Sequence, residues 1–257
     1  MSKKFSKSDK LYYNKNMRYL LKICYDGRRY SGWQKQNNAK SIEATIESAM
    51  SLVLGNNVDI VASGRTDAGV SALSQCAHFD CDKKLDESFV GHINSLLPQD
   101  IRVLGIEKVG DNFHARFDVK QKTYVYNFYT SKISLPVYDA TYTQVKTLID
   151  EDKFRKNMNM LIGTHDFTSF CASDTQVKDK TRTIYDAQLF KDGSSFSFKI
   201  TGDGFLYNMV RIIVGTLIDI ASGKIDLSIL DIINKKDRSF AGKTLASGGL
   251  KLYDVKY

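Results

Sequence analysis

The chain has 257 residues, 42% of them hydrophobic, which is enough to bury a core as one large domain or two of ordinary size. Its formal net charge of +8 favours a polyanionic partner, nucleic acid before an acidic membrane surface, although many basic proteins bind neither. No cysteine pair has Cys-x-x-Cys spacing and no histidine lies at zinc-finger spacing, so we expect reduced thiols and no metal site. No apolar run is long enough to span a membrane, and we expect a cytoplasmic protein.

The chain opens with a predicted tail and a strand. Residues 1–16 are polar and lysine-rich, which indicates a flexible basic tail, and they lack the apolar segment of a secretory signal. Residues 17–25 alternate in polarity, as a strand does. Trp33, the only tryptophan, stands beside a glycine and basic residues. Such a group can stack on and neutralise RNA, but a tryptophan that fills the core is an equally good interpretation.

A helix then leads toward a loop between two strands. Residues 41–54 carry apolar side chains at helical spacing, with Ser41 as the predicted N-cap and Gly55 at the end. A strand-like run over 58–61 enters the loop, and residues 77–80 leave it as another strand. We therefore expect regular structure to hold the loop on both sides.

The loop itself places Arg65, Thr66 and Asp67 between two glycines, Gly64 and Gly69. Glycines let a chain bend where side chains would clash. A cation and a carboxylate this close together suit a loop that positions a charge. The alternative is a surface turn with an incidental ion pair, because turns are generally rich in Gly, Asp and Thr.

Elements up to residue 109 have the order of a ferredoxin-like unit. Residues 86–97 predict a second helix, closed by Pro98, and residues 101–109 predict another strand. The order strand, helix, strand, strand, helix, strand is typical of an antiparallel sheet with helices on one face.

The second half repeats a layout of sheet and helices. Its predicted elements are a strand at 123–129, a helix at 152–162, a polar mobile loop at 171–181, a hairpin of 183–190 with 195–202, a helix at 205–222, a short helix at 227–233 capped by Asp226, and a last strand at 249–255. We therefore predict an α+β protein of two halves, 17–112 and 113–257, with one cleft between them.

Two arginines are candidates for contact with an anion. Arg211 lies in the middle of the predicted helix at 205–222, which is apolar nearly all round, so its charge is costly unless a carboxylate or a phosphate meets it. Its long stem can alternatively carry the charge to the surface. Arg116 follows the predicted start of the second half and can bind a phosphate.

Several strings resemble, in chain order, the motifs of the TruA family of tRNA pseudouridine synthases. The closest is Gly-Arg-Thr-Asp-Ala-Gly-Val-Ser-Ala at 64–72. The others lie at 25–34, 113–116 with 122–126, 163–170, 207–215 and 249–252, so the resemblance runs from about residue 17 to the last residue. Two positions depart from the family pattern: Ser71 stands where His is usual, and Ala246 where Pro is usual.

The resemblance implies the pseudouridine synthase fold, in which two ferredoxin-like halves with antiparallel sheets meet at a central cleft. It makes Asp67 the catalytic nucleophile, paired with Arg211, and Tyr124 the ring that stacks on the target base and can help move a proton. Arg65 and Arg211 would orient Asp67 and keep it ionised, since an opposite charge favours the charged form. Leu250 would pack at the active site, and substrate contacts are expected at Arg116, Trp33 and Leu250.

The implied reaction converts uridine to pseudouridine in the tRNA anticodon stem-loop, at positions 38 to 40, in a homodimeric enzyme. Because the change is an isomerisation, it requires no metal, redox cofactor or ATP. Two other classes remain open. A non-catalytic RNA-binding protein would not require Asp67, a negative charge facing phosphate. An RNA-modifying enzyme with a metal or methyl donor would be expected to show clustered His and Cys ligands or a G-x-G-x-x-G loop.

Overall fold

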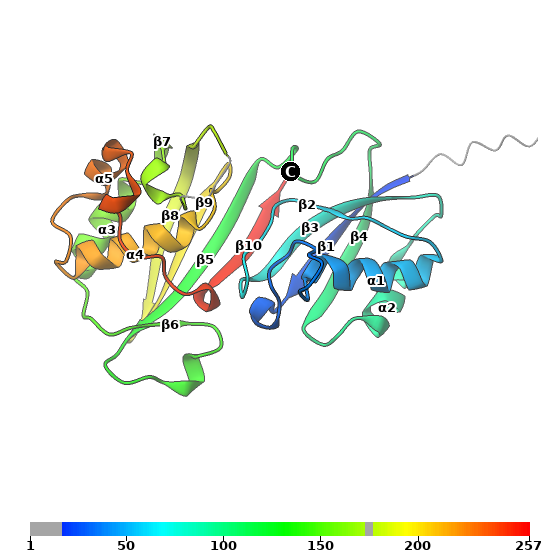
Figure 1. Cartoon of the computed structure of the whole chain (residues 1–257), viewed down its shortest axis with the longest axis horizontal. Helices are drawn as coiled ribbons and strands as arrows, with labels where there is room; N and C mark the ends of the chain where they lie inside the picture. The colour runs from blue at the N-terminus through cyan, green and yellow to red at the C-terminus, as the bar shows by residue number, and fades with distance from the viewer. Residues whose placement is uncertain (1–16, 173–176) are drawn as a thin grey trace, which may run out of the picture.

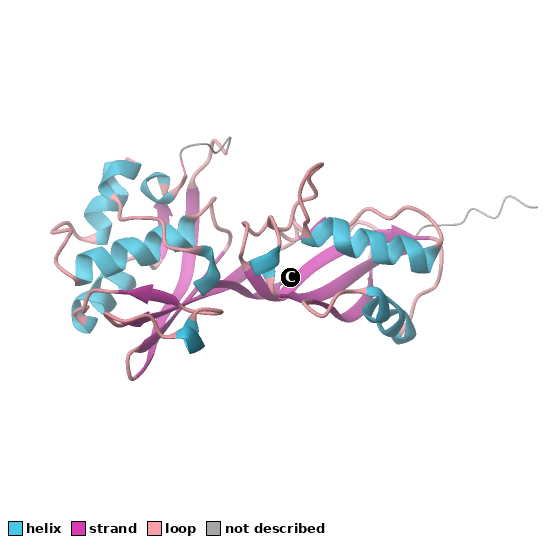
Figure 2. Cartoon of the chain, turned by 60° about the horizontal axis from the view of Figure 1, so that its bottom comes forward, coloured by secondary structure: helices cyan, strands magenta, loops and turns pink. Residues whose placement is uncertain are grey.

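The computed structural model describes residues 17–172 and 177–257, so the predicted tail at 1–16 and part of the predicted loop at 171–181 lie outside the described residues. Within these ranges the strands form one ten-stranded sheet with the main order β4-β1-β3-β10-β5-β9-β8-β7. The α+β class is confirmed, and the sheets of the two halves are joined into a single mixed sheet. Figures 1 and 2 show this sheet running along the molecule, with helices gathered at its two ends.

The N-terminal elements follow the polarity pattern of the sequence closely. They are β1 (Met17–Tyr25), α1 (Ile42–Leu54), β2 (Val61–Ala62), β3 (Ser71–Cys81), α2 (Glu87–Leu96) and β4 (Ile101–Val109). Ser41 caps α1 by accepting from the backbone N–H of Ala44, and Gly55 ends the helix at a φ of 78°, as predicted. The strand expected at 58–61 is shorter and begins further along the chain, because only Val61 and Ala62 pair with β3.

The C-terminal elements are β5 (Gln121–Thr130), β6 (Thr143–Val145), α3 (Glu151–Asn159), β7 (Gly163–Asp166), β8 (Thr181–Asp192), β9 (Ser195–Gly202), α4 (Met209–Ala221), α5 (Ile229–Lys235) and β10 (Leu250–Lys256). Two predicted helix starts were wrong. The helix expected from residue 205 begins at Met209, because Asn208 adopts a left-handed φ of 61°. The cap of α5 is Ser228, which forms a capping box with Asp231, and not Asp226.

Strand β10 joins the two halves of the sheet. It runs antiparallel to β5 and parallel to β3, with Lys251 opposite Ser71 and Leu252 opposite Ala72. The parallel pairing explains why the sheet is mixed. The last strand of the chain therefore lies beside the strand that leaves the Asp67 loop.

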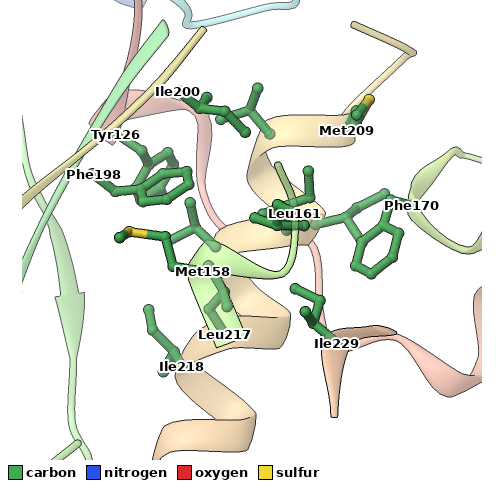
Figure 3. Packing of buried hydrophobic residues seen from close by; sticks show 14 of the residues in the cluster. Tyr126, Met158, Leu161, Phe170, Phe198, Ile200, Met209, Leu217, Ile218 and Ile229 are labelled. Atoms are coloured by element: carbon green, nitrogen blue, oxygen red, sulfur yellow. The ribbon is translucent and has the colours of Figure 1, made fainter. Parts of the chain in front are cut away.

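Each end of the sheet has its own hydrophobic core. Helices α1 and α2 cover β1, β3 and β4, while α3, α4 and α5 pack on the strands around β5, β8 and β9. Figure 3 shows part of the second core, where Tyr126 and Phe198 from the sheet face Leu217 and Ile218 of α4. Val70 of the Asp67 loop belongs to this second core, although the loop follows elements of the first. The loop is thereby placed where the two cores meet.

The described parts of the chain contain no helix long and apolar enough to cross a bilayer.

Candidate active site

A cleft of about 810 Å³ lies where the two cores meet, and both halves of the chain line it. Six of the seven predicted site residues are on its wall: Trp33, Arg65, Asp67, Arg116, Tyr124 and Leu250. The seventh, Arg211, contacts Asp67 from α4. The tertiary structure thus brings residues separated by more than two hundred positions, such as Trp33 and Leu250, to one place.

The loop that carries Asp67 is held by hydrogen bonds on both sides. The Ser63 N–H donates to the Cys76 carbonyl over 2.7 Å, and the Trp33 N–H donates to the Thr66 carbonyl over 3.0 Å. The Thr66 hydroxyl lies 2.8 Å from the Tyr25 hydroxyl in a buried hydrogen bond. On the other side of Asp67, the Gly69 N–H donates to the Tyr30 carbonyl over 3.3 Å. The backbone is thus held on both sides of Asp67, so its carboxylate is positioned before a substrate arrives.

Close backbone approach beside the loop requires glycine. Gly32 has a φ of +95°, and a Cβ at this position would lie 2.7 Å from the Thr66 carbonyl oxygen. Ser71, the departure from the family pattern, accepts a hydrogen bond from the Gly27 N–H over 3.1 Å. Its hydroxyl therefore ties the start of β3 to the turn after β1.

The predicted pairing of Arg211 with Asp67 is confirmed. Arg211 Nη1 lies 3.7 Å from Asp67 Oδ2, with the two side chains 17% and 25% exposed. The guanidinium is itself oriented, because Nε donates to the Leu245 carbonyl over 2.7 Å and Nη1 donates to Asn208 Oδ1 over 2.6 Å. Arg211 is therefore held beside Asp67 and does not extend freely to solvent.

Burial and the guanidinium act on Asp67 in opposite directions. Burial raises the pKa of the Asp67 carboxyl above its ordinary value, and the charge of Arg211 pulls that pKa back down. The result is a poorly hydrated carboxylate whose ionised form depends on Arg211.

The orienting role that we expected for Arg65 has no ion pair behind it among the described residues. Its side chain is exposed on the cleft wall, and among the described residues it forms no ion pair with Asp67. The cation that lowers the pKa of Asp67 is Arg211, from a distant helix, and not the neighbour in sequence.

Tyr124 enters the cleft from β5 and stacks edge-on against Phe205, with ring centroids 5.1 Å apart. It packs against the hydrophobic cores of both halves. Burial, with further contributions from Tyr25 and Asp67, raises the pKa of its phenol far above the ordinary value. Tyr124 is therefore a neutral phenol at physiological pH, able to donate a proton or present a ring face.

The three predicted substrate contacts differ in exposure. Trp33 is 1% exposed and donates from its indole N–H to Glu43 Oε1 over 3.2 Å, so it fills the core, the second of its two possible roles. Leu250, 6% exposed, lines the cleft at the start of β10. Arg116 is exposed and lies over the ring of Phe117, with 5.9 Å from its guanidinium carbon to the ring centroid.

Two other cations of the cleft had no predicted role. Lys122 lies two positions before Tyr124 on β5 and Arg182 lies on β8, and both line the cleft. The period of a strand puts Lys122 and Tyr124 on the same face, a signal that was available from the sequence. Arg182 had no such signal, because β8 reaches the cleft only through sheet pairing.

Chemically, the cleft offers one desolvated carboxylate, one neutral phenol and several cations. The carboxylate can attack an electrophilic carbon or stabilise a positive centre, as in glycoside cleavage. The cations suit a polyanionic substrate.

Comparison with known proteins agrees with this chemistry. A family model described as tRNA pseudouridine synthase matches residues 23–118 and 158–257. A protein named tRNA pseudouridine synthase A from an Exiguobacterium species is 43% identical, covering 93% of this chain and 98% of that relative. A tRNA pseudouridine synthase A 1 from Bacillus cereus is 42% identical, covering 91% of this chain and 96% of the relative. Among solved structures, a chain of a Cbf5-Nop10-Gar1 complex aligns at 12% identity with a TM-score of 0.39, covering 91% of this chain and 57% of that chain.

Proposed function

The chain belongs to the TruA family of tRNA pseudouridine synthases, which isomerise uridine to pseudouridine, and on that premise we propose that Asp67 is its catalytic nucleophile toward a uridine of the tRNA anticodon stem-loop. The observation that carries the proposal is the pairing of Asp67 with Arg211 inside a cleft lined by cations. A carboxylate facing a polyanion is unfavourable for binding alone, so its presence supports a chemical role.

The proposed reaction is an isomerisation, so it leaves the composition of the substrate unchanged. The N1–C1′ bond of uridine breaks as Asp67 attacks or stabilises C1′, and the uracil turns. C5 then bonds to C1′, and any bond from the Asp67 carboxylate to C1′ breaks in that step. The proton on C5 then leaves and N1 gains one. Tyr124 presents its ring to the uracil and its neutral phenol to a proton transfer. To reach the cleft the target base must leave its stack, as for other enzymes that act on bases.

The test is tritium release from tRNA transcripts that carry 5-tritiated uridine, because forming the C5 bond must expel that label. Wild type is expected to release tritium and Asp67→Ala to release none. The variant should bind tRNA within about tenfold of wild type, since phosphate contacts supply most of the affinity. Asp59→Ala is the matched control, because it removes an exposed carboxylate that does not line the cleft. Full activity of Asp67→Ala would refute the proposal.

Tyr124→Phe separates the two roles of the tyrosine. A slower release of tritium is expected if the phenol moves a proton, whereas an unchanged rate would remove that role and leave the ring contact. Tyr124→Leu removes the aromatic ring as well and serves as the comparison.

Three finer statements follow from the family alone. We propose a homodimer, a cytoplasmic location with tRNA, and modification at positions 38 to 40. Light scattering tests the dimer, and mapping of pseudouridine in reacted transcripts tests the positions.

A further inference from the structure

Lys122 is a cation enclosed in the wall of the cleft. From β5 its Nζ reaches the Asp67 loop and donates to the Ser63 carbonyl over 2.6 Å. The space that it enters exists because residue 64 is glycine: a Cβ on Gly64 would lie 2.8 Å from this nitrogen. An ammonium has three N–H donors, so two remain after the bond to Ser63.

No carboxylate neutralises this ammonium. The charged groups that act on it are two further cations of the cleft, Arg116 and Arg182, and within the described residues none of the three forms an ion pair with a carboxylate. Arg182 is turned toward the carbonyls of Asp179 and Thr181, near the exposed Asp179 carboxylate. Three cations therefore converge from different elements, and among the described residues none of them is paired with a carboxylate.

The carboxylates that line the cleft are engaged elsewhere. Asp67 pairs with Arg211. Glu43 accepts from the Trp33 indole, from the Gln34 amide over 2.8 Å and from the Lys35 N–H over 2.6 Å. Arg65, also on the wall, adds another positive charge. Holding like charges close together is unfavourable unless an anion joins them.

We infer that Lys122, together with Arg116 and Arg182, binds a backbone phosphate of the substrate RNA inside the cleft. The inference rests on the proposed function, because it takes RNA as the substrate. A phosphodiester supplies the missing negative charge and accepts the free N–H donors of Lys122. Binding it also couples the RNA to the Ser63 carbonyl, and hence to the backbone that positions Asp67.

The proposed site makes RNA binding depend on pH in a defined direction. In the free protein, burial and the two guanidinium groups lower the pKa of Lys122 to about 8. A bound phosphate favours the charged ammonium and so raises that pKa. The complex therefore holds more protons than the free protein above pH 8, and RNA binding takes up a proton there. Affinity is expected to be about tenfold weaker at pH 9 than at pH 7 from this group alone.

The experiment is titration calorimetry of the full chain with a tRNA transcript, at pH 7 and pH 8.5, in buffers of different ionisation enthalpy. Wild type is expected to take up a proton at pH 8.5 and almost none at pH 7. Lys122→Met should lose that uptake, bind less tightly at pH 7 and show a salt slope lower by about one. Lys122→Arg should bind with little loss and take up no proton, because a guanidinium stays charged.

Lys156→Met is the matched control, since Lys156 lies on the exposed face of α3 and not on the cleft wall; it should behave as wild type. Equal proton uptake by wild type and Lys122→Met, or none by wild type, would overturn the inference. The wild-type measurement does not depend on whether a variant folds. Proton uptake with millimolar inorganic phosphate in place of RNA would show a site for free phosphate and would also overturn it.

Tritium release on the same transcript separates the two proposals. Release without proton uptake leaves the proposed function standing and refutes the phosphate site. Uptake without release supports the phosphate site and refutes the catalytic role assigned to Asp67 on that RNA.

Discussion

Replacing Arg211 by glutamine removes the cation that opposes the burial of Asp67. The Nη1–Oδ2 distance is 3.7 Å, and two unit charges so separated attract by about 1 kcal/mol in water and by about 4 kcal/mol at the effective dielectric of a protein surface. The two side chains are 17% and 25% exposed, so the pair lies between these limits. If this attraction keeps Asp67 ionised and aimed, its loss slows turnover by about fivefold to about a thousandfold.

The loss should also depend on pH. Burial already raises the pKa of Asp67. Without the charge of Arg211 to oppose burial, that pKa rises further. Less of the carboxylate is then ionised at any acidic pH. We expect the acid side of the pH–rate profile to move to higher pH in Arg211→Gln, and part of the rate to return as pH increases.

The assay is tritium release at saturating tRNA across the acid and neutral range, with circular dichroism to establish that the variant is folded. Asn208→Gly is the matched control. It keeps the left-handed backbone at φ 61° and removes the amide that accepts from Arg211, while the guanidinium charge remains. Its rate should fall less, and its acid side should stay near that of wild type. An Arg211→Gln enzyme with the wild-type rate and profile would refute the reasoning.

Three further changes test stability. Asp67→Asn should abolish turnover and raise the thermal midpoint of unfolding at pH 7. Folding raises the pKa of Asp67, so the ionised carboxylate destabilises the fold above its unfolded pKa; a lower midpoint in the variant would contradict this. Gly32→Ala should lower the free energy of unfolding by about 2 kcal/mol in urea titrations, because its positive φ strains an alanine and the added Cβ meets the Thr66 carbonyl oxygen. Gly91→Ala in α2, with open space around it, should raise the free energy of unfolding by about 0.5 kcal/mol. Ser228→Ala should cost about 1 kcal/mol through the lost capping box; an equal loss in Asp226→Ala would contradict this assignment.

The local elements were readable from the sequence because their causes are local. The strand β1 and the helix α1 follow from polarity periods and caps that involve residues a few positions apart. The same limit explains the errors at α4 and α5. Those helices start at an asparagine in a left-handed conformation and at a serine cap, and composition alone does not distinguish either from its neighbours.

The candidate residues were found largely through the resemblance of short strings, and the pairing of Arg211 with Asp67 was inferred in the same way. Arg65, in contrast, was expected to orient Asp67, but its side chain is exposed and forms no ion pair with Asp67 among the described residues. What a neighbouring side chain faces depends on the loop backbone, and distant groups such as the Trp33 N–H and the Cys76 carbonyl hold that backbone in place.

The sequence by itself determined most of the strands and helices and the identity of the charged loop, since these depend on contacts close along the chain. It did not predict β6 or β7. Only the tertiary structure decided that β10 lies between β3 and β5, which joins the sheets of the two halves into one. It alone brought Lys122, Arg116 and Arg182 together, with no carboxylate paired to any of them among the described residues. The physical reason is that strand order and charge clustering are set by pairings between distant segments, which no local period encodes.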